Sequence, residues 1–116
     1  MIEVRCPQLI TESPNKPIFH WSQRHRKVKR ERSAVALMLS QVRTRPEFPL
    51  VVTFVREAPR AFDDDNLAAS FKACRDQVAD WLNLPNDRDP RVTWRYGQEK
   101  TPRKRAGTLI RIEGRT

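Results

Sequence analysis

The sequence has few of the features of membrane and exported proteins. None of its apolar runs approaches the ~20 residues that a membrane-spanning helix needs, and its first residues lack the basic-then-apolar layout of a secretion signal. Only two cysteines occur, Cys6 and Cys74, and no histidine or further cysteine lies at zinc-binding spacing from either. We therefore expect a cytoplasmic protein without a membrane partner, with both cysteines as buried thiols in a reducing environment.

Internal repeats and low-complexity tracts are also absent, and the chain is too short for two domains. Its 116 residues are 38% apolar and 32% charged, which is enough for one modest core beneath a heavily solvated surface. We predict a single domain over residues 1–116.

Acidic residues are the minority, and they are unevenly distributed. The formal net charge is +9, yet residues 57–89 hold eight acids and four bases, so the flanking segments carry +13. A basic surface favours polyanionic partners, and an acidic centre within it suits a nucleic-acid enzyme, in which cations hold phosphates and carboxylates hold metal. A generic basic protein with an acidic loop has the same composition, so charge alone leaves both interpretations open.

The first half of the chain predicts a strand, a helix and a second strand. Residues 2–6 alternate between apolar and charged side chains up to Pro7, and residues 11–23 are typical of a loop. Apolar positions at helical spacing then predict a helix over residues 26–42. The β-branched run at 50–55 indicates a central strand that is covered on both faces.

A second helix is predicted over residues 66–82 from one continuous apolar stripe. Asp65 or Asn66 is the natural residue to cap its start, and Pro85 ends it. The members of the stripe are Leu67, Phe71, Cys74, Val78, Trp81 and Leu82.

The last third of the chain predicts two more strands. Alternation over residues 92–96 indicates a half-buried strand with basic residues on its open face. A basic loop over 101–107 then leads to a final strand over 109–112. The expected fold is therefore a small mixed α/β domain in which two main helices pack on one sheet, with the element order β-α-β-α-β-β.

Three consecutive aspartates, Asp63, Asp64 and Asp65, lie between the central strand and the second helix. Two carboxylates ~4 Å apart repel by about 4 kcal/mol at an effective dielectric near 20, and a divalent cation offsets that repulsion directly. If this segment is extended, Asp63 and Asp65 project to the same side and Asp64 faces away. That geometry offers two carboxylates to one Mg²⁺.

A third ligand can come from the turn before the strand at 92–96, which carries Asp87 and Asp89. Either residue reaches Asp63 only if that strand runs beside residues 50–56. The alternative is that all of these acids cap a helix and decorate loops, as aspartates before an amphipathic stripe usually do. The spacing alone leaves both interpretations open.

Basic side chains complete the candidate site. Lys72 lies beside the apolar stripe, where its ammonium group can stabilise charge on a scissile phosphate; alternatively, it pairs with Asp76 four residues on. Trp21 either stacks on an unpaired base or anchors a loop to the core. The candidate phosphate contacts are Arg24, Arg26, Lys27, Lys29, Arg30, Lys100, Arg103, Lys104 and Arg105.

Taken together, these segments resemble the RusA-type Holliday junction resolvases. The resemblance lies in residues 49–56, in residues 60–67 with their D-x-D-N-L core, in Lys72 on the helix, and in Asn86-Asp87 before a strand. The Ser13-Pro14-Asn15 turn, followed by a basic stretch and a helix, is also similar to the N-terminal region of that family. The similarity thus covers most of the chain.

The resemblance implies a Mg²⁺-dependent endodeoxyribonuclease, with Mn²⁺ as an alternative metal, that hydrolyses phosphodiesters with metal-activated water. It also implies a homodimer that nicks two strands of a four-way DNA junction symmetrically in recombination and repair. By position, Asp63, Asp65 and Asp87 match the metal-binding aspartates of the family.

Two positions depart from the family pattern. The family's helix lysine follows the second aspartate by four residues, a position that is Ala69 here, whereas Lys72 follows by seven. Asn86 stands where the family has the first residue of an Asp-Asp pair, and Asp89 remains a rival to Asp87 because its spacing to Val92 is better.

The sequence therefore supports three hypotheses. The first is the junction nuclease, with Asp63, Asp65, Asp87 and Lys72 as its catalytic residues. The second is a non-catalytic basic nucleic-acid-binding domain in which the aspartates only cap a helix. The third is a relative of the family that binds branched DNA without cleaving it.

Overall fold

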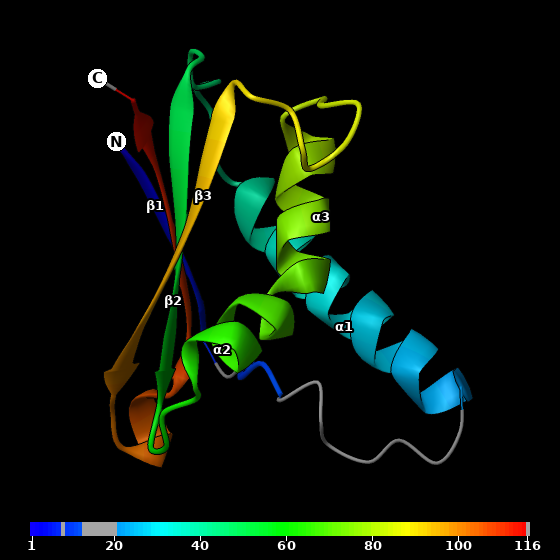
Figure 1. The fold of residues 1–116 in the computed structure, drawn as a ribbon, viewed down its shortest axis with the longest axis vertical. Helices are drawn as coiled ribbons and strands as arrows, with labels where there is room; N and C mark the ends of the chain where they lie inside the picture. Colours follow the sequence, from blue (N-terminus) through cyan, green and yellow to red (C-terminus); the bar gives the residue numbers. More distant parts are fainter. Residues whose placement is uncertain (8, 13–20, 116) are drawn as a thin grey trace.

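The computed structural model describes residues 1–7, 9–12 and 21–115. Within these residues a four-stranded mixed sheet is covered on one face by three α-helices (Figure 1). This architecture confirms the predicted α/β fold class and the predicted element order, except that the second helix is divided in two. The elements are β1 (Ile2–Pro7), α1 (Trp21–Leu39), β2 (Leu50–Ala58), α2 (Asp64–Ser70), α3 (Lys72–Trp81), β3 (Val92–Lys100), the short 3-10 helix η1 (Arg103–Arg105) and β4 (Gly107–Gly114).

The sheet has the strand order β1-β4-β2-β3, so β2 is an inner strand, as predicted. Strand β4 runs antiparallel to β1 and β2, whereas β3 runs parallel to β2, with Val92 beside Leu50 and Lys100 beside Ala58. A parallel neighbour requires a crossover connection, and α2 and α3 provide it. The residues just before Val92 therefore lie at the opposite end of these strands from the residues just after Ala58.

The core lies between the sheet and the helices. Phe54 of β2 is fully buried at its centre, where its ring stacks with Phe71 at a centroid distance of 5.2 Å and with Trp94 and Tyr96 at 6.0 Å each. Aromatic stacking of this kind adds to the burial of apolar area. Side chains buried around this stack include Val35, Leu39, Leu50, Val52, Val78, Ile110 and Ile112.

Only one face of the sheet is covered by helices in the described part of the chain (Figure 1). Thr53 and Val55 point to the other face and are half-buried there. The prediction that the strand at 50–55 is covered on both faces is therefore confirmed only in part, because Val51 is buried on this face but Thr53 and Val55 are not.

Helix α1 begins earlier and ends earlier than the apolar spacing predicted. It starts at Trp21, so the predicted loop is wrong for residues 21–23, while residues 13–20 of that loop lie outside the described residues. It ends at Leu39, three residues before Val42. Val28 is exposed, and it lines a hollow between α1 and the crossover helices.

The second predicted helix is interrupted at Phe71, which ends α2 and precedes α3. The N–H of Phe71 donates to Ala68 O, three residues back, instead of making the usual i to i−4 bond. The hydroxyl of Ser70 also bonds to Leu67 O at 2.8 Å, a contact that tends to bend helices. The apolar stripe itself is confirmed, since five of its six members are buried and Trp81 is half-buried.

The end of α3 is set by Asn83 rather than by Pro85. Asn83 has a positive φ of 60°, and the N–H of Leu84 bonds to Ala79 O at 3.0 Å. This is the hydrogen-bonded ending that commonly closes a helix with a left-handed residue.

Both cysteines are buried and free, as predicted. Burial raises the pKa of the Cys6 thiol to about 11 and raises the pKa of the Cys74 thiol further. In the part of the chain that the structure describes, no helix is both long and apolar enough to cross a membrane.

Candidate functional site

A row of polar side chains crosses the helix-covered face of the sheet near the end of β2. Arg56 of β2 lies in register between Thr108 of β4 and Gln98 of β3, and directly paired residues share a face. Thr108 Oγ1 donates to Leu9 O at 2.6 Å, and Arg56 Nε donates to Thr11 O at 3.2 Å. The row therefore holds the segment that follows β1 against the sheet.

The same row fixes Phe62, the residue directly before the acidic run. The Phe62 N–H donates to Gln98 Oε1 at 2.9 Å, and Gln98 Nε2 donates to Phe62 O at 2.8 Å. The guanidinium carbon of Arg56 lies 3.7 Å from the centroid of the Phe62 ring, a close cation–π contact. Asp63 therefore follows an anchored residue.

The acidic run begins at Asp63, which is the N-cap of α2. Asp63 is extended, with φ −63° and ψ 155°, and its carbonyl accepts the N–H of Leu67 at 2.8 Å, while its side chain makes no capping bond. The prediction that Asp65 or Asn66 caps the helix is therefore wrong. Because Asp64 and Asp65 already belong to the first helical turn, the extended geometry that placed Asp63 and Asp65 on one side ends at Asp63.

All three aspartates are exposed. No side chain of Asp63, Asp64 or Asp65 forms a hydrogen bond or ion pair with another residue that the structure describes. The start of a helix stabilises each negative charge by only about 0.3–1 kcal/mol. The run therefore places three negative charges on consecutive residues, without a cation partner among the described residues.

Asp87 lies elsewhere, in a cluster with two bases of α3. Its Oδ2 accepts a hydrogen bond from Lys72 Nζ at 3.1 Å and lies 2.8 Å from Arg75 Nε, an ion pair without hydrogen-bond geometry. The hydrogen bond from Lys72 holds the pKa of Asp87 below its usual range. The indole of Trp94 donates to Asp87 O at 2.8 Å and so fixes the backbone as well.

Lys72 is shared between two carboxylates. Its Nζ donates to Asp76 Oδ1 at 2.9 Å as well as to Asp87, and both hydrogen bonds raise the pKa of the lysine. The pairing with Asp76 that the four-residue spacing allowed is therefore confirmed. The side chain of Lys72 is still 57% exposed, so a phosphate can reach it.

Asp89, the rival third ligand, is also paired with a base. Its Oδ1 accepts from the N–H and Nε of Arg91 at 2.9 and 3.0 Å, and its Oδ2 accepts from Nη2 at 2.9 Å. The hydrogen bonds from the Arg91 side chain lower the pKa of Asp89. Each candidate for the third ligand is thus neutralised within the protein.

No three aspartate, glutamate, histidine or cysteine side chains lie close enough together to hold a metal ion in residues 1–7, 9–12 and 21–115. Asp63, Asp65 and Asp87 therefore do not form one group. Strands β2 and β3 are neighbours, which was the condition for a third ligand from the turn before β3. However, Asp87 precedes the start of β3, whereas Phe62 is held beside Gln98 near the end of β3. The register of the two strands explains the separation.

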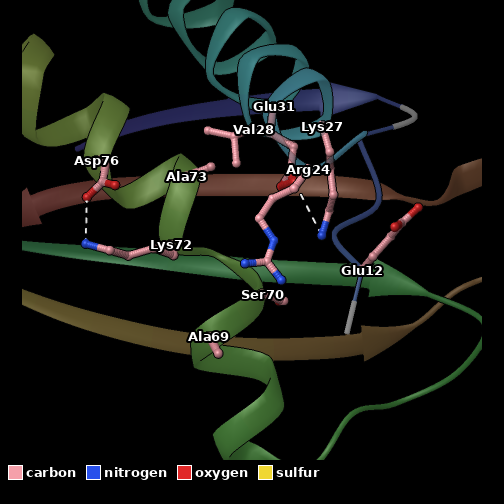
Figure 2. Close-up of a pocket in the computed structure, with 10 residues that line it drawn as sticks. All are labelled: Glu12, Arg24, Lys27, Val28, Glu31, Ala69, Ser70, Lys72, Ala73 and Asp76. Atoms are coloured by element: carbon pink, nitrogen blue, oxygen red, sulfur yellow. Dashed lines mark hydrogen bonds and ion pairs between the residues drawn. The ribbon is translucent and has the colours of Figure 1, made fainter. Parts of the chain in front are cut away.

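The basic cluster of α1 lies beside Lys72. Arg24 and Lys27 of α1 line one hollow of about 320 Å³ together with Lys72, and Figure 2 shows the three side chains around it. The other predicted contacts of this helix, Arg26, Lys29 and Arg30, are exposed. Two elements far apart in the sequence thus present cations to one surface.

Glu31 contributes a buried carboxylate to the same hollow (Figure 2). It is 4% exposed, its Oε1 lies 3.9 Å from Lys27 Nζ, and its Oε2 has no hydrogen-bond partner among the described residues. Burial raises the pKa of Glu31. The sequence contained one indication of this position, namely the four-residue spacing from Glu31 to Val35 and Leu39.

The predicted basic loop contains η1, which separates its three bases. Arg103 lines a hollow on the helix-covered side together with Arg56, whereas Lys104 and Arg105 line another hollow with Glu57. Arg103 therefore lines a different hollow from Lys104 and Arg105.

Trp21 and Lys100 are both accessible to solvent. Trp21 is 75% exposed at the start of α1, with its ring 6.5 Å from that of His25, so the prediction that it anchors a loop to the core is wrong. Lys100 is exposed at the end of β3. The Ser13-Pro14-Asn15 turn lies outside the described residues.

The sequence did not point to Arg56, Gln98 or Thr108, although they position the acidic run. All three occupy positions that face the core in strands otherwise filled with apolar residues. A charged residue two positions after a buried Phe54 was the available indication, because alternation directs both to the same face.

Comparisons with known proteins identify no relative of the chain. No family model, no curated protein and no solved structure matches the chain. The resemblance to the RusA-type resolvases therefore remains an expectation that depends on the residues quoted for it.

Proposed function

We propose that this chain is a metal-dependent endodeoxyribonuclease that cleaves branched DNA, with the four-way junction as its substrate. The observation that carries the proposal is the run Asp63–Asp65, three adjacent exposed carboxylates without a cation partner among the described residues. The chain has a net charge of +9, and bases do neutralise Asp87 and Asp89. An acidic run left unpaired in such a protein favours the role of a cation ligand.

The donor set at this run suits Mg²⁺. This ion keeps several waters and usually takes one or two protein carboxylates together with substrate phosphates, so a group of three carboxylates is not required. In this proposal Asp63 and Asp65 are the protein ligands. Mn²⁺ is an alternative because it takes the same oxygen ligands. When bound, the metal would supply an activated water for phosphodiester hydrolysis and charge to stabilise the transition state.

The third ligand stays a prediction. To join the acidic run, both residues would have to move: Asp87 pairs through Oδ2 with Lys72 and Arg75, and Asp89 pairs through both oxygens with Arg91. A phosphate that draws Lys72 away from Asp87 would weaken one of these contacts, because both compete for the same ammonium group. In this proposal Lys72 neutralises the scissile phosphate, and its exposed side chain supports that role.

The basic surfaces hold the DNA backbone. Arg24 and Lys27 share their hollow with Lys72, so phosphates bound along α1 would lead towards the crossover helices that carry the acidic run. Contacts of this kind give affinity without reading sequence. Symmetric nicking of two strands requires two such sites related by a twofold axis, so a homodimer is part of the proposal.

A non-catalytic nucleic-acid-binding domain is the second candidate. The observation that favours it is the place of Asp63 at the N-cap and of Asp64 and Asp65 in the first turn of α2, where acidic residues commonly stabilise a helix. The same basic surface serves this function without any metal.

A cleavage assay separates the two candidates. Four-way, three-way and linear DNA are incubated with the protein in Mg²⁺, in Mn²⁺ and in a chelator, and binding is measured in parallel. We expect metal-dependent cleavage of the four-way junction by paired nicks. Junction binding without cleavage in either metal would instead support the non-catalytic domain.

A further inference from the structure

Arg56 is a buried cation without a carboxylate partner. Its residue is 6% exposed, and burial lowers the pKa of its guanidinium group. Its hydrogen bonds go to two neutral acceptors, Thr11 O and Arg60 O, and its guanidinium lies over the ring of Phe62. No described acid forms an ion pair with it.

A buried charge of this kind is costly unless an opposite charge accompanies it. Carbonyl oxygens and an aromatic face stabilise the guanidinium group only in part. Arginine does not escape the cost by losing its proton, since its pKa stays above the range in which proteins work. The positive charge of Arg56 therefore lacks a negative charge beside it.

Arg56 lies in the wall of a hollow of about 410 Å³ that two more arginines share. Arg60 comes from the turn after β2, and Arg103 comes from η1; both are exposed. Glu12 also lines the hollow, which leaves an excess of positive charge. Three arginines, two from the end of β2 and the turn after it and one from η1, thus line one hollow.

We propose that this hollow binds one phosphate group of a nucleic-acid backbone, with Arg56, Arg60 and Arg103 as its donors. The planar fork of arginine matches the oxygens of a phosphate, and such charge-assisted hydrogen bonds are the stronger class. Because Arg56 lies over Phe62, directly before Asp63, the bound phosphate lies next to the acidic run. The source of the phosphate rests on the proposed nucleic-acid function, whereas the anion site itself does not.

The first test follows binding of inorganic phosphate and of a short single-stranded oligonucleotide by ¹⁵N–¹H NMR in a chelator. We expect saturable shifts of the Arg56 Nε–Hε signal and of the Arg60 and Arg103 amides. The amide of Arg43, an exposed arginine between α1 and β2, is the internal control. Shifts that do not saturate, or that are equal at Arg43, would overturn the anion site.

The second test measures binding of a four-way junction without metal. The double variant Arg60→Gln, Arg103→Gln should bind about tenfold more weakly, while Arg43→Gln, compared per charge removed, should change affinity far less. Arg56→Lys keeps the charge and loses the fork, and it should weaken phosphate binding if it folds. Equal loss of affinity per charge in the double variant and in Arg43→Gln would overturn the proposal.

These outcomes are independent of cleavage. A protein that binds phosphate and DNA through the three arginines but never cuts a junction would refute the nuclease and leave the phosphate site in place. A protein that cuts junctions, but whose metal-free junction affinity is unchanged by the loss of Arg60 and Arg103, would refute the phosphate site alone.

Discussion

Two groups of aspartates flank the crossover between β2 and β3, and their surroundings are opposite. Asp63–Asp65 are exposed and lack a cation partner among the described residues, whereas Asp87 and Asp89 are held by bases. The difference arises from the neighbouring segments: α3 directs Lys72 and Arg75 at the second group, and the turn before β3 directs Arg91 at it. A motif of aspartates therefore does not by itself distinguish a metal ligand from a structural ion pair.

The largest expected effect on cleavage comes from removing one charge from the run Asp63–Asp65. Asp63→Asn should lower Mg²⁺-dependent junction cleavage by about a hundredfold or more, since a carboxylate ligand is lost at the reacting centre. Asparagine is also a good N-cap, so the start of α2 should be preserved. Junction binding should survive or tighten, because one charge that repels phosphate is removed.

Asp64→Asn is the matched control, with the same change of charge one residue later. We expect it to retain most of the cleavage activity. Full cleavage by Asp63→Asn would contradict the nuclease, and equal losses in both variants would mean that the run acts only through its total charge.

Much of the fold was predictable because the local patterns agree with the tertiary structure. The alternation at residues 2–6 and 92–96, the β-branched run at 50–55 and the stripe from Leu67 to Leu82 all gave the right element type. The break at Phe71 was not predictable from apolar spacing, because it depends on an aromatic stack and on the hydroxyl of Ser70. Periodicity reports which face is buried and not where a helix bends.

The candidate site was predictable only in its residue types. From the sequence, the adjacency of the strand at 92–96 and the central strand was only a condition for the site. The sequence did not set their register, and the register separates Asp87 from Asp63. The pairing of Asp87 with Lys72 and Arg75 joins residues distant in sequence. Spacing along one chain contains no information on such contacts.

A smaller effect is expected from removing the hydrogen bonds that hold Phe62, the residue directly before Asp63–Asp65. Gln98→Ala removes both side-chain bonds to Phe62 and should lower cleavage about tenfold, because misplaced ligands lose much of their effect. The Mg²⁺ concentration for half-maximal cleavage should rise, which a general loss of stability would not cause. Gln77→Ala, which removes one bond to Arg32 on α1, is the control; the same Mg²⁺ shift in both variants would argue against positioning by Gln98.

Substitution of Asp87, which is paired with bases, should change the free energy of unfolding rather than the rate of cleavage. Asp87→Asn should lower the free energy of unfolding by about 1 kcal/mol at pH 7, a value limited by the exposure of Lys72. The pKa of Asp87 is lowered in the folded protein, so this stability is present above the ordinary carboxyl pKa of about 4 and is lost as the pH falls through the lowered value. Urea denaturation of both proteins should therefore differ at pH 7 and converge once the pH falls below the lowered pKa of Asp87.

A loss of cleavage without a loss of stability would support the prediction from sequence that Asp87 is a metal ligand. If Asp87→Asn abolished cleavage and left the unfolding free energy unchanged, Asp87 would be the third metal ligand. Asp89→Asn is the comparison variant, since Asp89 is paired with Arg91 alone.

The smallest expected effect distinguishes the two sides of η1 and thus the direction from which DNA approaches the unpaired aspartates. Lys104→Ala should weaken binding to junctions of any sequence about two- to threefold and lower the salt slope by about one. Arg103→Ala should weaken binding more, because Arg103 shares its hollow with Arg56, whereas Lys104 lies in a hollow that also contains Glu57 and Glu99. Fluorescence anisotropy over a series of salt concentrations measures both slopes. A larger loss for Lys104 than for Arg103 would place the DNA on the open face of the sheet, away from Asp63, and the acidic run would then have no route to a phosphodiester.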